Sequence, residues 1–417
     1  MSGSSTRGSF LRRFAGPEAK EIFLLCQPDS PSPGDIIQQT ESAYGTLHRL
    51  LCSEGGGLEH VLQETVFFRN IREDLAAFCE VRRRAPGARF PAFRPASTFI
   101  GQPPLAEGAR LEISAVAVIP HDRRSTRAWD VWRTSPCACH DCSRLSARAL
   151  VLGSQRYLRT GNIYGSPGTP FAEAYSMFRS AEDLLRQEGL SFQDVVRTWI
   201  YLRDIDRDYA NLNRARRAFF QDRDITLRPA STGICGAPFP QAHNFSMSLY
   251  AIKSAEPLER DVMTTPTLNE AWKYGADFSR GLKVVEANKV ALYVSGTASV
   301  NEEGGTAHIG DFDAQVERML LNVSTLLAAQ NASLDDLVSA TTYLKIPADA
   351  SRLRRILQRK GLENLPNAMV HAAVCRPSLL CEMEAIAALP RPVPGQRESQ
   401  SDVIGRAHQA ADGDQRS

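Results

Sequence analysis

The chain has 417 residues, 43% of them hydrophobic and 23% charged, which are ordinary values for a globular protein of several domains. Its formal net charge of +2 is too balanced to favour nucleic acid or an anionic membrane as a partner. The sequence contains no run of about 18 apolar residues, so it predicts no membrane span. The amino terminus lacks the apolar core of a secretion signal. Nine cysteines without such a signal fit a reducing compartment. We therefore expect a cytoplasmic protein.

One sequence unit recurs three times. Its clearest copy is residues 334–347, LDDLVSATTYLKIP, and the earlier copies are residues 192–205 and 58–71. In each copy a polar helix start leads into a β-branched and aromatic segment, which is typical of a strand. The copies lie about 140 residues apart, a spacing too long for a solenoid repeat and suited to a small domain. The chain therefore predicts three modules of one kind.

The first copy shows the order of elements within a module. It predicts β-α-β-α-β-β, an α+β unit in which one sheet carries helices on a single face. Residues 1–20 are polar and predict an arm. The predicted strands are 23–26, 65–68 and two that begin near 94 and 111, and the predicted helices are 34–51 and 75–83.

The later copies follow the same order. The second predicts strands at 149–152 and 157–164, a helix at 170–187 and a central strand around Trp199. The third predicts a strand at 291–295, a turn at Gly296 and a helix at 313–330. We place the modules at residues 20–120, 149–255 and 265–390, with a cysteine-rich linker at 121–148 and a disordered tail at 391–417. The first module is the most degenerate copy.

The free faces of the three predicted sheets suggest how the modules pack. Each sheet has helices on one face only, so its other face must be buried elsewhere. Packing these faces around a common axis predicts an intramolecular pseudo-trimer with a cleft between each pair of modules. Because the modules have diverged, their side chains decide which cleft is functional.

A pair of carboxylates closes the third module. Glu382 and Glu384 alternate along the last predicted strand and therefore share a face. A carboxyl buried in a cleft has a raised pKa and is available as a general acid. Only the third module has glutamate at the second position, which favours Glu384 as the acid; the alternative is a carboxylate pair on a surface strand. The corresponding residues are Glu112 and Ser114 in the first module, and Ser246 and Ser248 in the second.

Several other side chains suggest a carboxylate ligand. Arg376, Arg197 and Arg203 could each bind a carboxylate with two hydrogen bonds. Alternatively, an arginine on a strand packs its stem across apolar surface. Cys375 is either a nucleophile or a buried structural thiol.

Residues 137–142 contain a dense group of soft metal ligands, namely Cys137, Cys139, His140 and Cys142. Thiolates and imidazoles bind zinc, but a tetrahedral site normally draws ligands from separate segments. A metal site would therefore need help from a residue such as His121 or Cys235. The alternative is a cysteine-rich linker without metal, and we predict no cofactor.

Two of these segments resemble a known family. Residues 295–344, SGTASV through TTYL, and EMEAIA at 382–387 resemble the RidA/YjgF superfamily, whose small chorismate-mutase-like domains form trimers with ligand sites between subunits. All three modules fit this pattern. Imine-hydrolysing members carry a substrate-binding arginine two residues after the proline of a PAR motif. This chain has Ser97, Ser231 and Ala368 at those positions.

A narrower resemblance covers residues 150–389. RTWIYLRDI at 197–205, KYGADFSRG at 273–281 and VCRPSLLCEME at 374–384 are similar to chorismatases, sometimes called pteridine-dependent deoxygenase-like proteins. These enzymes hydrolyse the enol-pyruvyl ether of chorismate. The resemblance implies Glu384 as the catalytic acid. It implies a substrate site made of Arg197, Tyr274, Arg280, Cys375 and Arg376.

Two functions follow from these observations. The first is a small-molecule hydrolase that cleaves the enol-pyruvyl ether of chorismate or a related carboxylate in a cleft between the second and third modules. The second is a RidA-like enamine or imine deaminase, or a non-catalytic protein that binds a small ligand. The expected partner is a small carboxylate, and a fused pseudo-trimer is expected to be a monomer or a low-order homo-oligomer.

Overall fold

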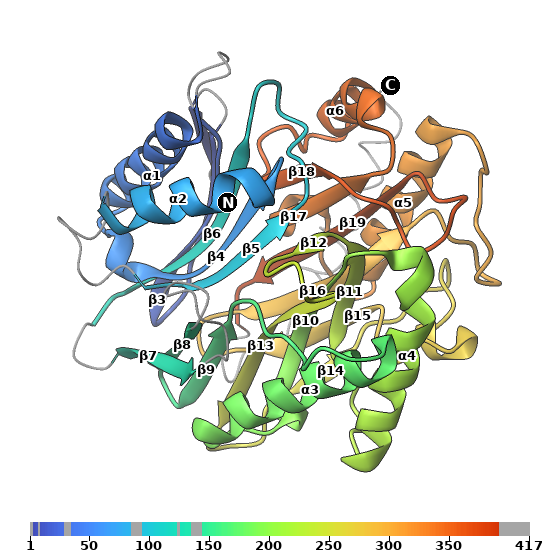
Figure 1. Cartoon of the computed structure of the whole chain (residues 1–417), viewed down its shortest axis with the longest axis horizontal. Helices are drawn as coiled ribbons and strands as arrows, with labels where there is room; N and C mark the ends of the chain where they lie inside the picture. The colour runs from blue at the N-terminus through green and yellow to red at the C-terminus, as the bar shows by residue number, and fades with distance from the viewer. Residues whose placement is uncertain are drawn as a thin grey trace, which may run out of the picture.

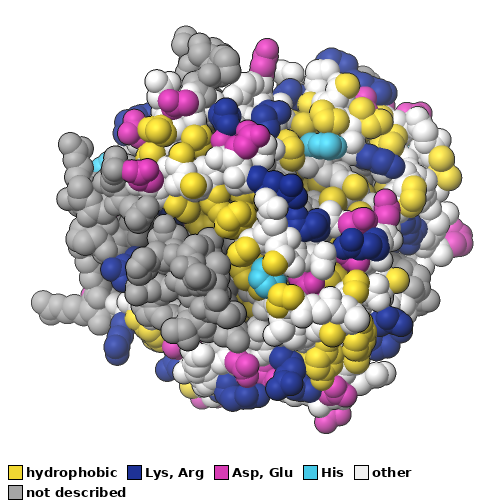
Figure 2. All heavy atoms as spheres, in the orientation of Figure 1, with side chains coloured by type: hydrophobic (Ala, Val, Ile, Leu, Met, Phe, Trp, Pro, Cys, Tyr) yellow, Lys and Arg dark blue, Asp and Glu magenta, His cyan; other side chains and the backbone are white. Residues whose placement is uncertain are grey.

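The structure is a computed structural model that describes residues 3–6, 9–28, 35–84, 94–122, 126–134 and 144–391. It is an α+β fold with three mixed sheets, each covered by two helices (Figure 1). Within the described ranges, no helix is both long and apolar enough to cross a membrane. Lys and Arg side chains are interspersed with Asp and Glu on the face shown in Figure 2.

The first sheet has seven strands in the order β1-β2-β3-β6-β4-β5-β12. The predicted arm at residues 1–20 is wrong, because residues 9–15 form a strand whose Leu11 and Phe14 are buried. The elements are β1 Gly3–Thr6, β2 Ser9–Ala15, β3 Ala19–Cys26, α1 Ile36–Ser53, η1 Leu58–His60, β4 Val61–Phe68, α2 Ile71–Arg84, β5 Ala96–Gly101 and β6 Leu111–Pro120, with β12 Ala237–Pro238 added from later in the chain.

The second sheet has six strands in the order β11-β10-β13-β9-β8-β7. The expected linker at 121–148 is wrong for its described part, because β7 and β8 pair as a hairpin at the edge of this sheet. Val131 and Ala147 are buried there, while charged residues on the other face obscure the alternation. The elements are β7 Arg127–Thr134, β8 Arg144–Leu152, β9 Gln155–Thr160, α3 Pro170–Gln187, η2 Phe192–Asp194, β10 Val195–Leu202, α4 Ile205–Asp222, β11 Ala230–Cys235 and β13 Phe245–Ser254.

The third sheet has six strands in the order β14-β15-β16-β19-β17-β18. Its first strand begins before the predicted boundary at 265. Gly296 was expected to form a turn but lies within β16, where the pairing with β19 shifts register between Val294 and Thr297. The elements are β14 Arg260–Val262, η3 Ala271–Tyr274, β15 Gly281–Val285, β16 Val290–Ala298, α5 Phe312–Ala328, η4 Leu334–Asp336, β17 Leu337–Leu344, η5 Pro347–Asp349, α6 Ala350–Arg359, β18 Asn367–His371 and β19 Cys381–Leu389.

The three sheets share one topology at their centres. In each, a central strand (β4, β10 or β17) pairs parallel with the next strand in the chain and antiparallel with the closing strand. The registers Phe67↔Glu112, Tyr201↔Ser246 and Tyr343↔Glu382 place three closing-strand residues in equivalent positions. The sequence repeat is thus also a structural repeat.

One side chain in the first turn of each module's first helix holds the start of the closing strand. Gln39 accepts a hydrogen bond from the backbone N–H of Arg110 at 2.7 Å. Gln315 accepts one from Leu380 at 2.8 Å, and Glu173 accepts one from Asn244 at 2.6 Å. Each acceptor lies four residues after a helix N-cap, at Asp35, Asp311 or Thr169. The same local device therefore fixes all three closing strands.

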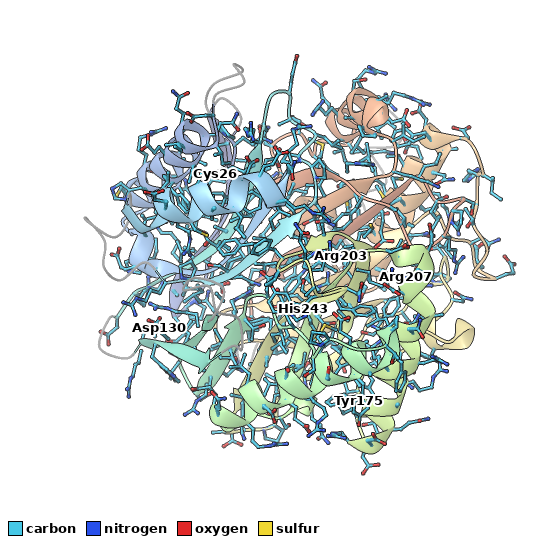
Figure 3. The ribbon with its side chains drawn as sticks, in the orientation of Figure 1. Cys26, Asp130, Tyr175, Arg203, Arg207 and His243 are labelled. Carbon is cyan, nitrogen blue, oxygen red and sulfur yellow. The ribbon has the colours of Figure 1, made fainter. Side chains whose placement is uncertain are left out.

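A second contact of this kind involves Arg203, which the sequence predicted to bind a carboxylate. Its guanidinium donates to the backbone oxygens of His243 at 2.8 Å and Pro238 at 2.9 Å (Figure 3). Arg69 and Lys345 follow the other central strands and likewise donate to carbonyls of the loop before the closing strand. Arg203 is thus occupied in holding a loop.

Contacts between sheets join every pair of modules. Ala237 pairs with Gly101, Ala230 bridges Ser279, and Pro104 bridges Val370. These bridges extend the edge of one sheet toward the next. The modules therefore meet through backbone pairing as well as through side-chain packing.

A buried ionic cluster joins the first and third modules. The Lys289 ammonium donates to both carboxylate oxygens of Glu21, at 2.7 and 2.8 Å, and to Glu286 at 2.7 Å. All three residues are at most 3% exposed. The two carboxylates offset the cost of burying the ammonium, so removal of the lysine would leave two unpaired buried charges.

Candidate active site between the second and third modules

A small cleft lies where the second module meets the third. The second module contributes Tyr209 from α4, and Ser231 and Gly233 from β11. The cleft volume is about 30 Å³, close to that of one water molecule. A larger ligand must therefore widen it. The third module contributes Phe278, Arg280, Gly296, Ala298, Val300, Cys375, Arg376, Leu379 and Glu382.

Glu382 is the carboxyl group of this cleft. On β19 it lies between Ala298 of β16 and Tyr343 of β17, and it is 4% exposed. Burial raises its pKa to about 8; the nearby charge of Glu384 adds to this increase, and Arg280 opposes it. The group is therefore mainly protonated at neutral pH, as a general acid must be.

The space for this carboxyl group depends on Gly296. A methyl group at position 296 would lie 2.1 Å from Glu382 Oε1 and 3.2 Å from Thr232 Cγ2. The Gly296 N–H donates to Thr232 Oγ1 at 3.0 Å, which fixes the backbone beside the acid. Any larger residue at 296 would displace Glu382. The glycine predicted as a turn residue thus has a different role.

Two predicted arginines reach the same cleft. Arg280 Nε donates to the backbone oxygen of Asn269 at 2.9 Å, and Arg376 Nη1 donates to that of Gly304 at 2.6 Å. A carboxylate is a stronger acceptor for guanidinium than a neutral carbonyl. The pair is therefore suited to exchanging these carbonyls for an anionic ligand.

Cys375 lies beside Arg376 in the cleft wall. Burial raises the pKa of its thiol to about 12, an increase to which Glu382 adds. The thiolate is the nucleophilic form, and it is scarce at neutral pH at such a pKa. The structure therefore favours the alternative of a buried structural thiol over a nucleophile.

Arg216 is a further arginine near the cleft that the sequence analysis did not single out. It lies on α4, is 3% exposed, and its Nη1 is 3.3 Å from Ser231 Oγ. Its guanidinium lies 5.4 Å from the Phe278 ring centroid, and that of Arg280 lies 5.8 Å from the same centroid. Cations at this distance are attracted by the ring face. Phe278 thus links arginines from two modules.

Glu384 lies in a different place from the one expected. Its carboxylate accepts hydrogen bonds from Arg197 Nη2 at 2.7 Å and from Trp199 Nε1 at 2.9 Å. These three residues line a chamber of about 60 Å³ whose wall is drawn from all three sheets. Burial lowers the pKa of Arg197, and the charge of Glu384 opposes this change.

The expectation that Glu384 and Arg197 share a cleft with Arg280 and Arg376 is therefore wrong. Although Glu382 and Glu384 project from one strand face, the β16 register shift and the convergence of the sheets direct them into separate cavities. The structure unites Arg280, Cys375 and Arg376 with Glu382. It unites Arg197 with Glu384.

The equivalent carboxyl group, between the third and first modules, is covered. Glu112, at the position of Glu382, is fully buried, and its pKa is raised by burial to about 8. Gln27, the residue after β3, donates to its Oε1 at 2.9 Å, whereas the residue paired with Glu382 on β16 is Ala298, whose side chain has no donor. In the second module the equivalent residue is Ser246, whose Oγ accepts from Asn162 of the same module at 3.3 Å. Thus a side-chain amide donates to the equivalent residue in both other modules.

Three sequence predictions fall partly or wholly outside the described residues. Tyr274 ends η3, the segment that leads to Arg280, but its side chain lies outside them. The proposed metal ligands Cys137, Cys139, His140 and Cys142, and the predicted disordered tail beyond residue 391, also lie outside them. The helping ligands lie apart, with His121 exposed and bonded to the Gly16 carbonyl, and Cys235 near the Arg203 carbonyl.

Comparison of the modules contains the signal that identifies Glu382. Glu112 and Glu382 are equivalent, so a carboxyl recurs at this position in two modules, while Glu384 is unique to the third. Glu384 was favoured because only the third module has glutamate at that position. The glutamate that recurs in two modules instead indicates the position that faces a cleft. Neither pattern shows that Ala298 leaves the cleft open, because that depends on strand register.

The fold is that of a chorismatase crystal structure, which aligns with a TM-score of 0.59 at 16% identity over 89% of this chain and 99% of the other. The family model described as endoribonuclease L-PSP matches residues 272–389. A chorismatase from Streptomyces rapamycinicus is 28% identical over 226 residues, 48% of this chain and 65% of that protein. The chain thus spans about two thirds of that relative's length.

A second relative defines the family. A RutC family protein from Pyrococcus abyssi is 34% identical over 98 residues, which are 23% of this chain and 76% of the relative. Together with the match over the third module, this likeness confirms the resemblance drawn from the sequence. The chain belongs to the RutC family of the RidA/YjgF superfamily.

Proposed function

We propose that the protein is a chorismatase-like hydrolase that cleaves the enol-pyruvyl ether of chorismate or of a related carboxylate. The working cleft lies between the second and third modules of an intramolecular pseudo-trimer. The observation that carries this proposal is the buried Glu382 carboxyl, with its pKa near 8, in one cleft with Arg280 and Arg376. The likeness to chorismatases supports the choice of substrate.

Glu382 takes the role first assigned to Glu384. Its proton is transferred to the terminal methylene carbon of the enol ether, which leaves an oxocarbenium cation. Water adds to the cation, and the resulting hemiketal collapses to pyruvate and the ring alcohol. The proton released by the water restores the carboxyl, so the balance is one ether and one water giving one pyruvate and one alcohol.

Glu384 is less suited to this step. Both oxygens of its carboxylate already accept hydrogen bonds, from Arg197 and Trp199, and they face the chamber rather than the cleft. An acid must hold its proton until the substrate arrives. Among the described residues, no side chain donates a hydrogen bond to Glu382, so its neutral form is the favoured one.

Arg280 and Arg376 bind the substrate carboxylates. Both now donate to loop carbonyls, at Asn269 and Gly304. Replacing these acceptors with carboxylates releases the two loops and widens the cleft beyond its 30 Å³. Binding and opening are therefore the same event, and charge-assisted hydrogen bonds supply the free energy.

Incubation of the purified protein with chorismate, followed by a pyruvate assay, tests the proposal. We expect turnover to fall about 100-fold or more in Glu382→Gln and to persist in the matched control Glu112→Gln. In the unaltered protein, turnover should decline above about pH 8 as Glu382 loses its proton. Turnover that is unchanged in Glu382→Gln but lost in Glu384→Gln would restore the original assignment.

A non-catalytic ligand-binding protein is the second candidate, favoured by the small volume of the cleft. It predicts no pyruvate but saturable binding of chorismate by calorimetry, weakened in Arg376→Ala. An imine deaminase is less well supported, because Ser231 stands at the position of the substrate-binding arginine. Release of ammonia from a 2-imino acid generated in the assay would favour the deaminase instead.

A further inference from the structure

The chamber that contains Glu384 is a second polar cavity, separate from the cleft. Its volume is about 60 Å³, roughly that of two water molecules. All three modules contribute to its wall, through β4 and β6, through β9 and β10, and through β17 and β19. It is therefore a product of the fused arrangement, because no single module encloses it.

Hydrogen-bond donors dominate this wall. Arg197 is 1% exposed, and its Nη2 is shared between Glu384 and Thr232, at 2.7 and 2.6 Å. Its Nη1 is buried and has no hydrogen-bond partner among the described residues. A buried guanidinium nitrogen without an acceptor costs free energy, so the site is suited to a group that accepts a hydrogen bond. Further hydroxyl donors on the wall are those of Thr65, Ser114, Ser339 and Thr341.

The charges on the wall determine the sign of a ligand. Two guanidinium groups, from Arg159 and Arg197, face one carboxylate, from Glu384. That carboxylate is already paired with Arg197 and bonded to Trp199. Arg159 donates to Gln63 at 2.7 Å and stacks 3.9 Å from the Tyr250 ring centroid. The wall thus carries excess positive charge and no unpaired carboxylate to bind a cation.

We propose that this chamber binds one small monovalent anion, of the size of chloride, bromide or nitrate, through Arg197 Nη1 and the surrounding hydroxyls. The volume excludes organic acids as large as the proposed substrate. The bound anion stabilises the junction of the three modules, because its binding site forms only where all three modules meet. The proposal does not depend on hydrolysis in the cleft between the second and third modules.

Bromide provides the probe. Crystals soaked in sodium bromide should show an anomalous peak in contact with Arg197 Nη1. In solution, chloride should raise the unfolding temperature about 2 °C more than gluconate at equal ionic strength, since gluconate is too large for the chamber. Arg197→Gln should abolish this difference between the salts. A chamber without a bromide peak, or equal effects of both salts, would overturn the proposal.

A milder variant keeps the test valid if Arg197→Gln does not fold. Thr341→Val removes one hydroxyl donor but retains the Arg197–Glu384 pair, and it should reduce the salt difference. Ser53→Ala, at the exposed end of α1, is the matched control and should retain the full difference. Equal salt differences in Thr341→Val, Ser53→Ala and the unaltered protein would also count against the site.

Discussion

The clefts on either side of the third module contain the same carboxyl group in two different settings. Glu382 and Glu112 are equivalent in register, both are buried, and burial raises the pKa of both to about 8. They differ in the neighbouring residue, which is Ala298 of β16 beside Glu382 and Gln27, just after β3, beside Glu112. A methyl group leaves the acid facing a cavity, whereas an amide covers it.

This difference teaches that the acid alone does not define an active site in this fold. Burial is enough to raise the pKa, and it acts in both clefts. What separates a reactive group from a structural one is whether a ligand can reach it. In the third cleft, Ser246 replaces the acid and accepts a hydrogen bond from Asn162 of the same module. Asn162 in turn bonds to the backbone of Phe99 in the first module.

Covering Glu382 should produce the largest effect. Ala298→Gln would place an amide where Gln27 lies in the other cleft, and the new hydrogen bond would block the acid. We expect turnover to fall about 100-fold with little change in unfolding temperature, measured by the pyruvate assay and by calorimetry. Full activity in this variant would contradict the explanation based on covering.

Moving Glu382 should have the next largest effect. Gly296→Ala places a methyl within 2.1 Å of Oε1, so the carboxyl must turn away from the substrate. We expect kcat to fall about 10- to 100-fold, with a smaller change in KM. Gly45→Ala in α1, where the nearest atom is 3.7 Å away, is the control and should be fully active.

The covered acid should influence stability rather than turnover. Burial raises the folded-state pKa of Glu112 to about 8 from its ordinary value of 4.5. Between pH 4.5 and about 8, Glu112 holds a proton in the folded chain and releases it in the unfolded chain. The free energy of unfolding therefore falls as the pH rises through this range. Glu112→Gln should remove a slope of about 1.4 kcal/mol per pH unit at most, measured by urea unfolding from pH 5 to 8. An unchanged slope would contradict the raised pKa.

The smallest effect is expected from a change that keeps the charge. Arg376→Lys retains a cation but loses the planar fork that binds a carboxylate with two hydrogen bonds. We expect KM to rise about 10-fold while kcat stays within about twofold, since the acid is untouched. A fall in kcat at unchanged KM would instead place Arg376 in the chemical step.

Local sequence patterns were sufficient to predict several of the central elements. The strand pattern around Trp199, the helix at 170–187 and the closing strand from Cys381 all follow from short-range periodicity, and the structure has them. The strands β2 and β7 were missed. In β2 the adjacent Arg12 and Arg13 interrupt the apolar pattern, and β7 lies at the edge of its sheet with charged residues among its apolar ones. An edge strand buries only one face, which leaves a weak signal.

The sequence by itself determined the threefold repeat, the α+β class and the family, because these depend on local periodicity and on motifs within single elements. Only the tertiary structure decided that Glu382 and Glu384, two residues apart on one strand face, open into different cavities. That outcome depends on the register shift in β16 and on Ala298, Arg197 and Thr232 from other strands and modules. Contacts between distant segments leave no periodic pattern in the chain, so their consequences appear only once the sheets are packed together.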